Sequence, residues 1–288
     1  MCKVQTVGVV GAGTMGSGIA QVFARAGFGV VLCDVETGLL ERAMGRIRAN
    51  LGREAAKSGL TEAEIESAVG RIRVAVEREA LAGVDLAVEA ASERFEVKAE
   101  IFRGLDRLTA KSTILATNTS SISIARLAAE TERPEMVIGM HFFNPVPVMA
   151  LVEVVRGPKT SDATFETVRA LSIALGKTPV AVNDAPGFVS NRVLMPLINE
   201  AAYAVMEGVA TAEAVDQVFK LGMAHPMGPL TLADLIGIDV CVDIMRVLES
   251  GFGSTKYSPC PLLVQMVEEG KLGRKAGRGF YEYGVQNR

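Results

Sequence analysis

Apolar residues in the first two-thirds of the chain follow two alternating patterns. The short runs Thr6–Val10 and Gly29–Cys33 contain no regular polar positions, which is typical of strands buried on both faces. Between them, apolar residues recur at helical spacing from Met15 to Ala26, and Gly27 provides a helix stop. A strand, a helix and a strand of these lengths predict a βαβ unit with a parallel pair.

Further strands and helices are predicted by the same reasoning. Residues 37–80 are rich in Ala, Glu, Arg and Ile and predict two helices, the second opening at a capping box of Thr61 and Glu64. Repeated alternation of strand and helix predicts an α/β fold with a Rossmann-like doubly wound sheet. The additional strands are expected at Leu86–Glu89, Ile114–Thr117, Val137–Met140, Leu151–Val155 and Val180–Val182.

The pattern changes at Asn183–Gly187. Beyond this segment, runs rich in β-branched residues nearly vanish and apolar residues take helical spacing. We therefore expect a Rossmann-like domain over residues 1–185 and a smaller all-helical C-terminal domain over residues 186–288. Helices are expected at residues 189–205, 212–221, 230–248 and 261–269.

Composition narrows the class of protein. The chain is 49% hydrophobic and 22% charged, with a net charge of -3 and both signs interspersed. The chain contains no basic block of the kind that indicates nucleic-acid binding, so no nucleic-acid partner is expected. Glycines and polar residues interrupt the apolar N-terminal stretch, so no membrane span is expected.

Four scattered cysteines bear on the cellular compartment. Cys2, Cys33, Cys241 and Cys260 form no C-x-x-C pair, which predicts free thiols in a reducing compartment and gives no indication of a metal site. The N-terminus resembles a strand rather than a signal peptide. We expect a cytoplasmic protein, while a transit peptide removed earlier remains an alternative.

A glycine-rich turn joins the first predicted strand to the first helix. Gly11 permits a tight turn, Gly13 lets the backbone approach a pyrophosphate, and Gly16 lets helix and strand pack closely. The helix start offers N–H groups and partial positive charge to phosphates. Asp34, after the next strand, can bind ribose hydroxyls and would repel a 2′-phosphate, which favours NAD over NADP. The alternative is a glycine loop without a ligand.

Two residues suggest acid–base chemistry. His141 follows one apolar run and Glu153 lies inside another, where it shares a strand face with Leu151 and Val155. A carboxylate on an apolar face is costly unless it is paired. Pairing with His141 would fix the imidazole tautomer and make the second ring nitrogen a base. A structural histidine, and an edge strand with Glu153 facing water, are the alternatives.

Small polar residues accompany this pair. Asn118 and Ser120 follow a predicted strand, Asn144 lies three residues after the histidine, and Asn191 begins the first long helix of the second domain. Open α/β sheets bind ligands at the carboxyl ends of their strands, where such groups could hold a substrate oxygen. Each residue could equally be a cap or turn former.

Six motifs in one order give the chain a family resemblance. It resembles the short-chain L-3-hydroxyacyl-CoA dehydrogenases, and among them the bacterial 3-hydroxybutyryl-CoA dehydrogenases. The motifs span nearly the whole chain and are together highly specific. They are Val7–Gly16, Asn118–Ser121, Gly139–Pro147, Pro186–Arg192, His225–Pro229 and Leu272–Tyr281.

The resemblance implies roles for matching positions. His141 resembles the catalytic base and Glu153 its partner. Ser120 and Asn191 resemble residues that contact the substrate's 3-oxygen and thioester region, and Asn144 a residue that supports the histidine. The implied NAD contacts are Gly11, Gly13, Thr14, Met15, Gly16, Asp34, Glu93, Lys98 and Asn118.

The family also implies partners. It places basic residues near the CoA phosphates in a helical hairpin inserted after Asp34, where Arg53 and Lys57 are candidates for substrate binding or for an ordinary solvated face. A homodimer is implied through the helical domain, which also helps to bind substrate. His225 lies in a Pro/Gly-rich loop and is expected to be structural. Arg274, Lys275 and Arg278 are expected in an ordinary surface loop, with a contact to CoA as the alternative.

The expected activity is NAD-dependent oxidation of a (S)-3-hydroxyacyl-CoA to the 3-ketoacyl-CoA, and its reverse, with His141 as general base and acid. The substrate is expected to be 3-hydroxybutyryl-CoA, and the setting fatty acid metabolism. Two alternatives remain: a dehydrogenase of a hydroxy acid without CoA, such as a sugar acid or carnitine, and a non-catalytic NAD-binding protein.

Overall fold

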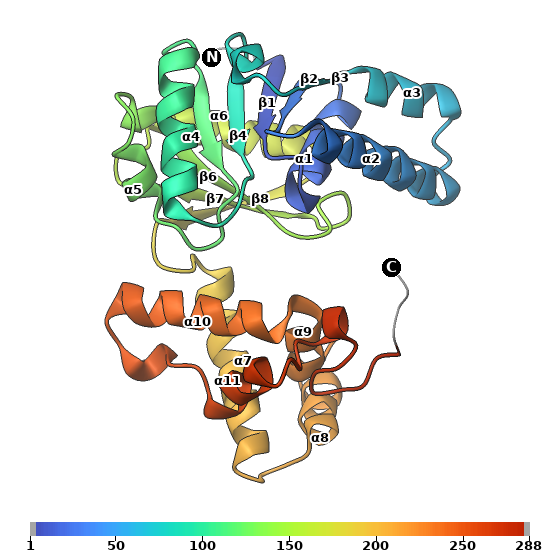
Figure 1. Ribbon diagram of the computed structural model, residues 1–288, viewed down its shortest axis with the longest axis vertical. Coiled ribbons are helices and arrows are strands. Elements are labelled where there is room, and N and C mark those ends of the chain that lie inside the picture. Colours follow the sequence, from blue (N-terminus) through green and yellow to red (C-terminus); the bar gives the residue numbers. More distant parts are fainter. Residues whose placement is uncertain (1–3, 285–288) are drawn as a thin grey trace. The chain divides into compact units, whose positions relative to one another are not determined.

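An eight-stranded sheet organises the first part of the chain (Figure 1). The computed structural model describes residues 4–284, apart from the side chains of Lys57 and Ser58. The chain divides into two units, Met1–Ala185 and Pro186–Arg288. The division lies where the spacing of apolar residues changes from strand runs to helical stripes.

The sheet has the order β3-β2-β1-β4-β5-β6-β7-β8, and all its neighbours are parallel except β6 and β7. Strand order reverses between β1 and β4, so their carboxyl ends flank the crevice where open sheets bind ligands. The strands are β1 (Thr6–Val10), β2 (Gly29–Cys33), β3 (Ile72–Ala75), β4 (Leu86–Glu89), β5 (Ile114–Thr117), β6 (Val137–Phe142), β7 (Leu151–Arg156) and β8 (Thr178–Asn183).

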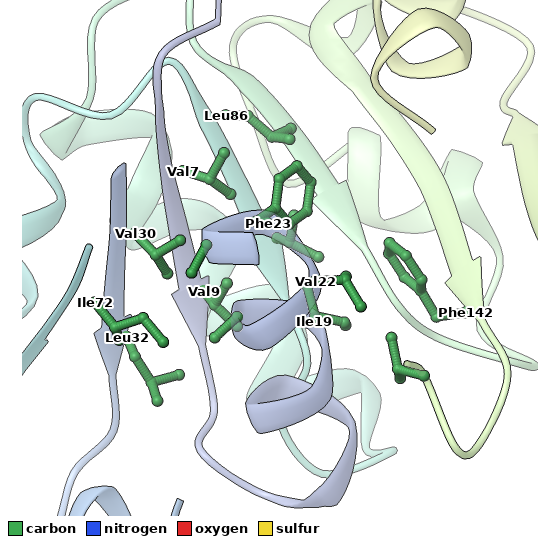
Figure 2. Packing of buried hydrophobic residues seen from close by; sticks show 14 of the residues in the cluster. Val7, Val9, Ile19, Val22, Phe23, Val30, Leu32, Ile72, Leu86 and Phe142 are labelled. Carbon is green, nitrogen blue, oxygen red and sulfur yellow. The ribbon is translucent and has the colours of Figure 1, made fainter. Parts of the chain in front are cut away.

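Helices pack on this sheet and form its core. Figure 2 shows Ile19 and Phe23 of α1 against Val7, Val9 and other strand residues, all of them buried. The helices are α1 (Thr14–Arg25), α2 (Thr37–Ser58), α3 (Glu62–Gly70), α4 (Phe95–Leu108), α5 (Ile124–Ala128) and α6 (Asp162–Ala174), with short 3-10 turns η1 (Arg78–Leu81) and η2 (Pro134–Met136).

The second unit is helical. Met195, Ile198, Val242 and Leu263 are among the buried residues of its core. Its helices are α7 (Ser190–Met206), α8 (Ala212–Gln217), the π-helical turn η3 (Val218–Gly222), α9 (Pro229–Ile236), α10 (Ile238–Phe252) and α11 (Pro261–Glu268), with 3-10 turns η4 (Thr255–Tyr257) and η5 (Arg274–Ala276). The predicted fold class, a Rossmann-like sheet followed by a helical C-terminal region, is confirmed.

Two predicted helical segments are wrong in part. The second helix predicted within residues 37–80 ends at Gly70, because residues 72–75 form β3, an edge strand with only one buried position. The helix expected over residues 230–248 is two helices, because Gly237 adopts a φ of 110° that residues with a side chain rarely take. The capping box of Thr61 and Glu64 is present as predicted.

Among the residues from 4 to 284, no helix has the length and apolarity needed to cross a membrane.

Candidate active site

The glycine-rich turn is shaped by contacts that a side chain would break. A Cβ on Gly16 would lie 1.8 Å from the Gly11 carbonyl oxygen, and one on Gly11, at a φ of 103°, would lie 2.6 Å from the Ala90 carbonyl oxygen. Gly13 instead faces open space, with no atom within 4 Å of its ideal Cβ. As the N-cap of α1 it offers no side chain to the N–H groups of the first turn, which suits a phosphate.

Asp34 lies beside this turn. Its Oδ2 accepts a 2.6 Å hydrogen bond from the Ala12 N–H, and its Oδ1 one of 2.7 Å from the Val35 N–H. Arg46 of α2 donates a 2.6 Å hydrogen bond to the Ala12 carbonyl, which belongs to the next peptide unit. The turn is thus held at both ends of one residue.

A cavity of about 520 Å³ opens at this turn. Glycine backbone, Asp34, Arg78 and Ser92 contribute to its polar lining, and apolar side chains form most of the remainder, which fits the adenosine half of a dinucleotide. Thr14 and Met15 also line it. The apolar lining residues include Val35, Leu39, Val76, Val97 and Ile101.

His141 and Glu153 form a buried pair. They are direct register partners in the antiparallel pair β6 and β7, and Nδ1 of His141 lies 2.8 Å from Oε2 of Glu153. His141 is 8% exposed and Glu153 2%. Because β7 lies between β6 and β8, the edge-strand alternative for Glu153 is wrong. A carboxylate only accepts, so an ionised Glu153 directs the proton to Nδ1 and makes Nε2 the basic nitrogen.

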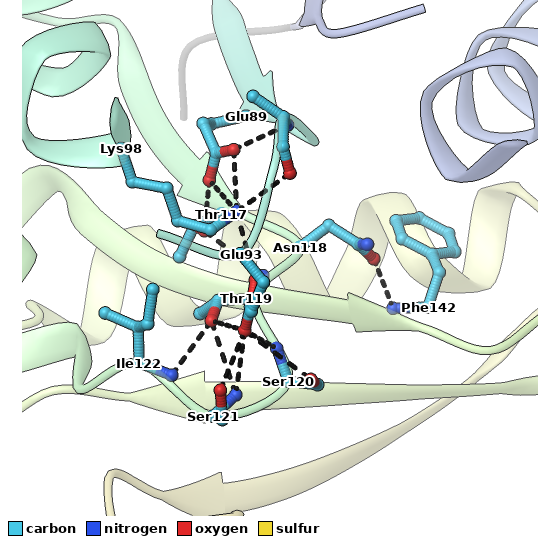
Figure 3. Close-up of polar contacts among 11 residues, drawn as sticks. Glu89, Glu93, Lys98, Thr117, Asn118, Thr119, Ser120, Ser121, Ile122 and Phe142 are labelled. Carbon is cyan, nitrogen blue, oxygen red and sulfur yellow. Dashed lines mark hydrogen bonds and ion pairs between the residues drawn. The ribbon is translucent and has the colours of Figure 1, made fainter. Parts of the chain in front are cut away.

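The loop after β5 carries Asn118 and Ser120. Oδ1 of Asn118 accepts a 2.9 Å hydrogen bond from the Phe142 N–H, which ties this loop to the residue next to His141 (Figure 3). Glu93 holds the following residues, since its Oε1 accepts from the Ser120 N–H at 3.0 Å and from Ser121 Oγ at 3.0 Å.

Glu93 also belongs to an ion-pair network with Lys98 and Glu89 (Figure 3). The Lys98 ammonium lies 2.7 Å from Glu89 Oε1 and 3.3 Å from Glu93 Oε2. Burial opposes ionisation of Glu93, but Lys98 and the hydrogen bonds from Thr119, Ser120 and Ser121 outweigh it, so the pKa of Glu93 is lowered. Burial raises the pKa of Glu89 against the opposing effect of Lys98.

Asn144 lies in an exposed turn after β6 and precedes a cis peptide bond to Pro145. Buried Lys177 donates hydrogen bonds from its ammonium to two backbone carbonyls just after Pro145, those of Val146 at 2.6 Å and Met149 at 2.8 Å. This lysine thereby fixes the segment between His141 and Glu153.

The remaining predicted residues lie elsewhere. Asn191 is buried in the first turn of α7, in the helical unit. Arg53 is exposed on α2 and donates to Asn50 of the same helix, and the Lys57 side chain lies outside the described residues. Exposed His225 packs against Phe219 with ring centroids 5.4 Å apart.

The basic residues of the C-terminal loop have partners close by. Arg274 lies over the Tyr283 ring, Lys275 pairs with Asp239, and Arg278 pairs with Glu282. No cluster of potential metal ligands occurs within the described part of the chain.

Sequence reasoning missed Glu89, Arg46 and Lys177. Glu89 had a usable signal, because it ends the buried run Leu86–Glu89 and a carboxylate in that position needs a partner. Arg46 and Lys177 gave none, since one charged residue on a helix and another before a strand look like ordinary surface residues.

Family models match both units of the chain. The family model described as "3-hydroxyacyl-CoA dehydrogenase, NAD binding domain" matches residues 6–185, and that described as "3-hydroxyacyl-CoA dehydrogenase, C-terminal domain" matches residues 187–283. The 3-hydroxybutyryl-CoA dehydrogenase of Bradyrhizobium diazoefficiens is 52% identical over 97% of this chain and 96% of its own length. That of Clostridioides difficile is 47% identical, over 96% and 98%.

A solved structure is similar as well. The crystal structure of (S)-3-hydroxybutyryl-CoA dehydrogenase from Ralstonia eutropha superposes with a TM-score of 0.95 at 48% identity. The similarity covers 98% of this chain and 100% of that one.

Proposed function

The chain belongs to the 3-hydroxyacyl-CoA dehydrogenase family and is an NAD-dependent oxidoreductase, and on this premise we propose that it interconverts (S)-3-hydroxybutyryl-CoA and acetoacetyl-CoA. The relatives that suggest this substrate match over nearly their whole length. The enzyme acts in the cytoplasm, within fatty acid metabolism, as a homodimer formed through the helical unit.

The buried pair of His141 and Glu153 carries the proposal. In the oxidative direction Nε2 of His141 takes the proton of the 3-hydroxyl, while Glu153 holds the ring through Nδ1 and stabilises the imidazolium. In the reductive direction the imidazolium returns that proton to the 3-ketone. The bound nicotinamide would supply the hydride acceptor for C3 in its oxidised form and the hydride donor to C3 in its reduced form, NADH.

The cofactor fits residues of the sheet unit. Gly11, Gly13 and Gly16, together with Thr14 and Met15, would hold the pyrophosphate at the start of α1, and Asp34 would accept hydrogen bonds from the ribose hydroxyls. Glu93, Lys98 and Asn118 follow the carboxyl ends of β4 and β5 in the chain and would supply the remaining cofactor contacts.

Substrate contacts complete the proposal. The Ser120 hydroxyl and the Asn191 amide bind the 3-oxygen and the thioester region, and Asn144 supports the histidine segment. Arg53 is a candidate for a CoA phosphate contact because it is exposed and cationic on α2. Lys57 is proposed with it from sequence alone.

A steady-state assay of the purified protein tests the function. NADH oxidation is measured with acetoacetyl-CoA, with longer 3-ketoacyl-CoAs and with free keto acids, and NADPH is tested in parallel. We expect turnover with acetoacetyl-CoA and NADH, because Asp34 repels a 2′-phosphate. Activity on free keto acids but not on acyl-CoAs would show that the substrate is a keto acid without CoA. NADH binding without turnover of any of these substrates would indicate a non-catalytic NAD-binding protein.

The His141→Ala variant tests the base. We expect kcat to fall about 10²–10⁴-fold with little change in NADH affinity, because positioned proton transfer contributes a factor of this size. The chain's other histidine is the matched control, since exposed His225 is not among the proposed catalytic residues and His225→Ala should retain turnover. Activity of His141→Ala within about tenfold of the parent would rule out the base assignment.

A further inference from the structure

Lys98 and Glu89 form a buried ion pair between the cofactor cavity and the loop that carries Ser120. Lys98 is 1% exposed and Glu89 is fully buried, and the Lys98 ammonium lies 2.7 Å and 2.9 Å from the two carboxylate oxygens. A buried ammonium without a counter-charge is strongly destabilising, and breaking such a pair costs far more than an exposed pair contributes. Glu89 therefore supplies the counter-charge that a lysine buried in this position requires.

Both carboxylate oxygens of Glu89 accept hydrogen bonds. Oε1 accepts from the Ala91 N–H at 2.6 Å as well as from Lys98, and Oε2 accepts from Thr117 Oγ1 at 2.6 Å. The first bond holds the segment after β4, and the second reaches the end of β5. Charge-assisted hydrogen bonds of this kind are the strong ones.

The network reaches both halves of the site. Toward the cofactor, Ala90, Ala91 and Ser92 line the dinucleotide cavity, and the Ala91 backbone is held by Glu89 and Lys98. Toward the substrate, Lys98 pairs with Glu93, whose other oxygen accepts from the Ser120 backbone. Figure 3 shows this chain of contacts from Glu89 to the loop that carries Ser120.

We propose that Glu89 is a positioning residue of the reaction, which acts through Lys98 and Glu93 to set the Ser120 loop relative to the cofactor cavity. This inference rests on the proposed function, since it assigns Ser120 to substrate binding. Glu89 lies inside the strand end and touches no reacting atom. Its effect should therefore appear in kcat and in its coupling to Ser120, and less in NADH affinity.

The Glu89→Gln variant tests the proposal because it keeps the shape and removes the charge. We expect kcat for acetoacetyl-CoA reduction to fall by at least about tenfold, the factor that corresponds to losing a hydrogen bond between charged groups. Glu96→Gln is the matched control, since Glu96 is an exposed carboxylate in the first turn of α4, the helix that carries Lys98, and has no place in the site. It should retain the parental kcat.

A double-mutant cycle separates positioning from general damage. If Glu89 acts through Ser120, then Glu89→Gln combined with Ser120→Ala should lose little more activity than Ser120→Ala alone, whereas independent effects would multiply. The cycle of Glu96→Gln with Ser120→Ala should be multiplicative. Multiplied losses in the Glu89 cycle, or a lower Tm with kcat within about twofold of the parent, would overturn the proposal.

A second pair of variants tests the proposal if Glu89→Gln alone folds poorly. The Glu89→Gln/Lys98→Met double variant removes both charges and so leaves neither buried without its partner. Its kcat should be no lower than that of Lys98→Met alone, because Glu89 acts through Lys98. A further large loss in the double variant would contradict this. Failure of the proposed function is distinguishable, since the parental protein would then lack acetoacetyl-CoA turnover while NADH titrations of all variants remain measurable.

Discussion

The register of β6 and β7 places the His141 imidazole opposite its partner Glu153. Opposed residues of an antiparallel pair have their Cβ atoms about 4.5–5.5 Å apart, which lets two short side chains meet without distorting the backbone. His141 opposes Glu153 in this way. Chemistry alone suggested the pairing from the sequence, but register could not be predicted, because it depends on the connection between β6 and β7. That connection contains a cis proline and is held by Lys177.

Glu153→Gln tests what the charge adds to this pair. The amide oxygen can still accept from Nδ1, so the ring should stay in place, but the imidazolium loses its stabilising carboxylate. We expect kcat to fall about 10- to 100-fold, which corresponds to the roughly 1.5–3 kcal/mol of a hydrogen bond to a charged group. NADH affinity should be retained. Glu166→Gln is the control, since Glu166 is a partly exposed carboxylate on α6 that pairs with Arg169, and it should behave as the parent. Equal kcat in the Glu153 and Glu166 variants would show that Glu153 only orients the ring.

Glu93 supports a prediction about acid stability. Its pKa lies below the ordinary value of 4.5, although burial alone would raise it, because Lys98 and the hydrogen bonds from the Ser120 loop favour the carboxylate. A lowered pKa in the folded state means stability that is present above pH 4.5 and is lost as the pH falls through the folded-state value.

Denaturant unfolding of the parent and of Glu93→Gln, at pH 7 and in steps below pH 4.5, measures the contribution of the Glu93 charge to the free energy of unfolding. We expect the parent to be more stable at pH 7 and the difference to shrink on acidification. A difference that stays constant would show that a neutral side chain holds the loop equally well.

At the scale of elements, the buried central strands were predictable, whereas the exposed edge strand β3 was not. The strands at the centre of the sheet are continuous apolar runs, and their predicted positions coincide with β1, β2, β4 and β5. The edge strand β3 has exposed Arg73 and Val74, so its composition could not be distinguished from that of a helix. The same limit applies to Arg46, whose contact with the glycine turn depends on how α2 packs on α1.

Arg46→Met tests whether α2 stabilises the phosphate-binding turn. The variant removes the donor to the Ala12 carbonyl, and we expect NADH to bind about 5- to 10-fold more weakly, since a partly exposed charged hydrogen bond contributes about 1 kcal/mol or slightly more. NADH fluorescence titration measures this. Arg48→Met on the same helix is the control, because Arg48 pairs with Glu66 on an exposed face. Equal NADH affinities for the two variants would exclude a role for Arg46.

At the scale of the whole molecule, the two units differ in their surfaces. Among the described residues, seventeen large hydrophobic side chains are exposed, and ten of them belong to the helical unit, although it is the smaller one. Val218, Leu221 and Met223 lie within one short segment, and Leu221 is 83% exposed. Exposed apolar side chains gathered in this way mark interaction surfaces, which supports the homodimer proposed for this unit.

Leu221→Asp tests that interface. A charge placed in an apolar contact must be desolvated without a partner, so the variant should dissociate to monomers at concentrations where the parent is dimeric. Sedimentation velocity over a range of concentrations measures this. Ile173→Asp is the matched control, since Ile173 is 53% exposed on α6 of the sheet unit and should leave the mass of the particle unchanged. If Ile173→Asp dissociates the dimer while Leu221→Asp does not, the contact surface lies on the sheet unit; a monomeric parent would remove the homodimer from the proposal altogether.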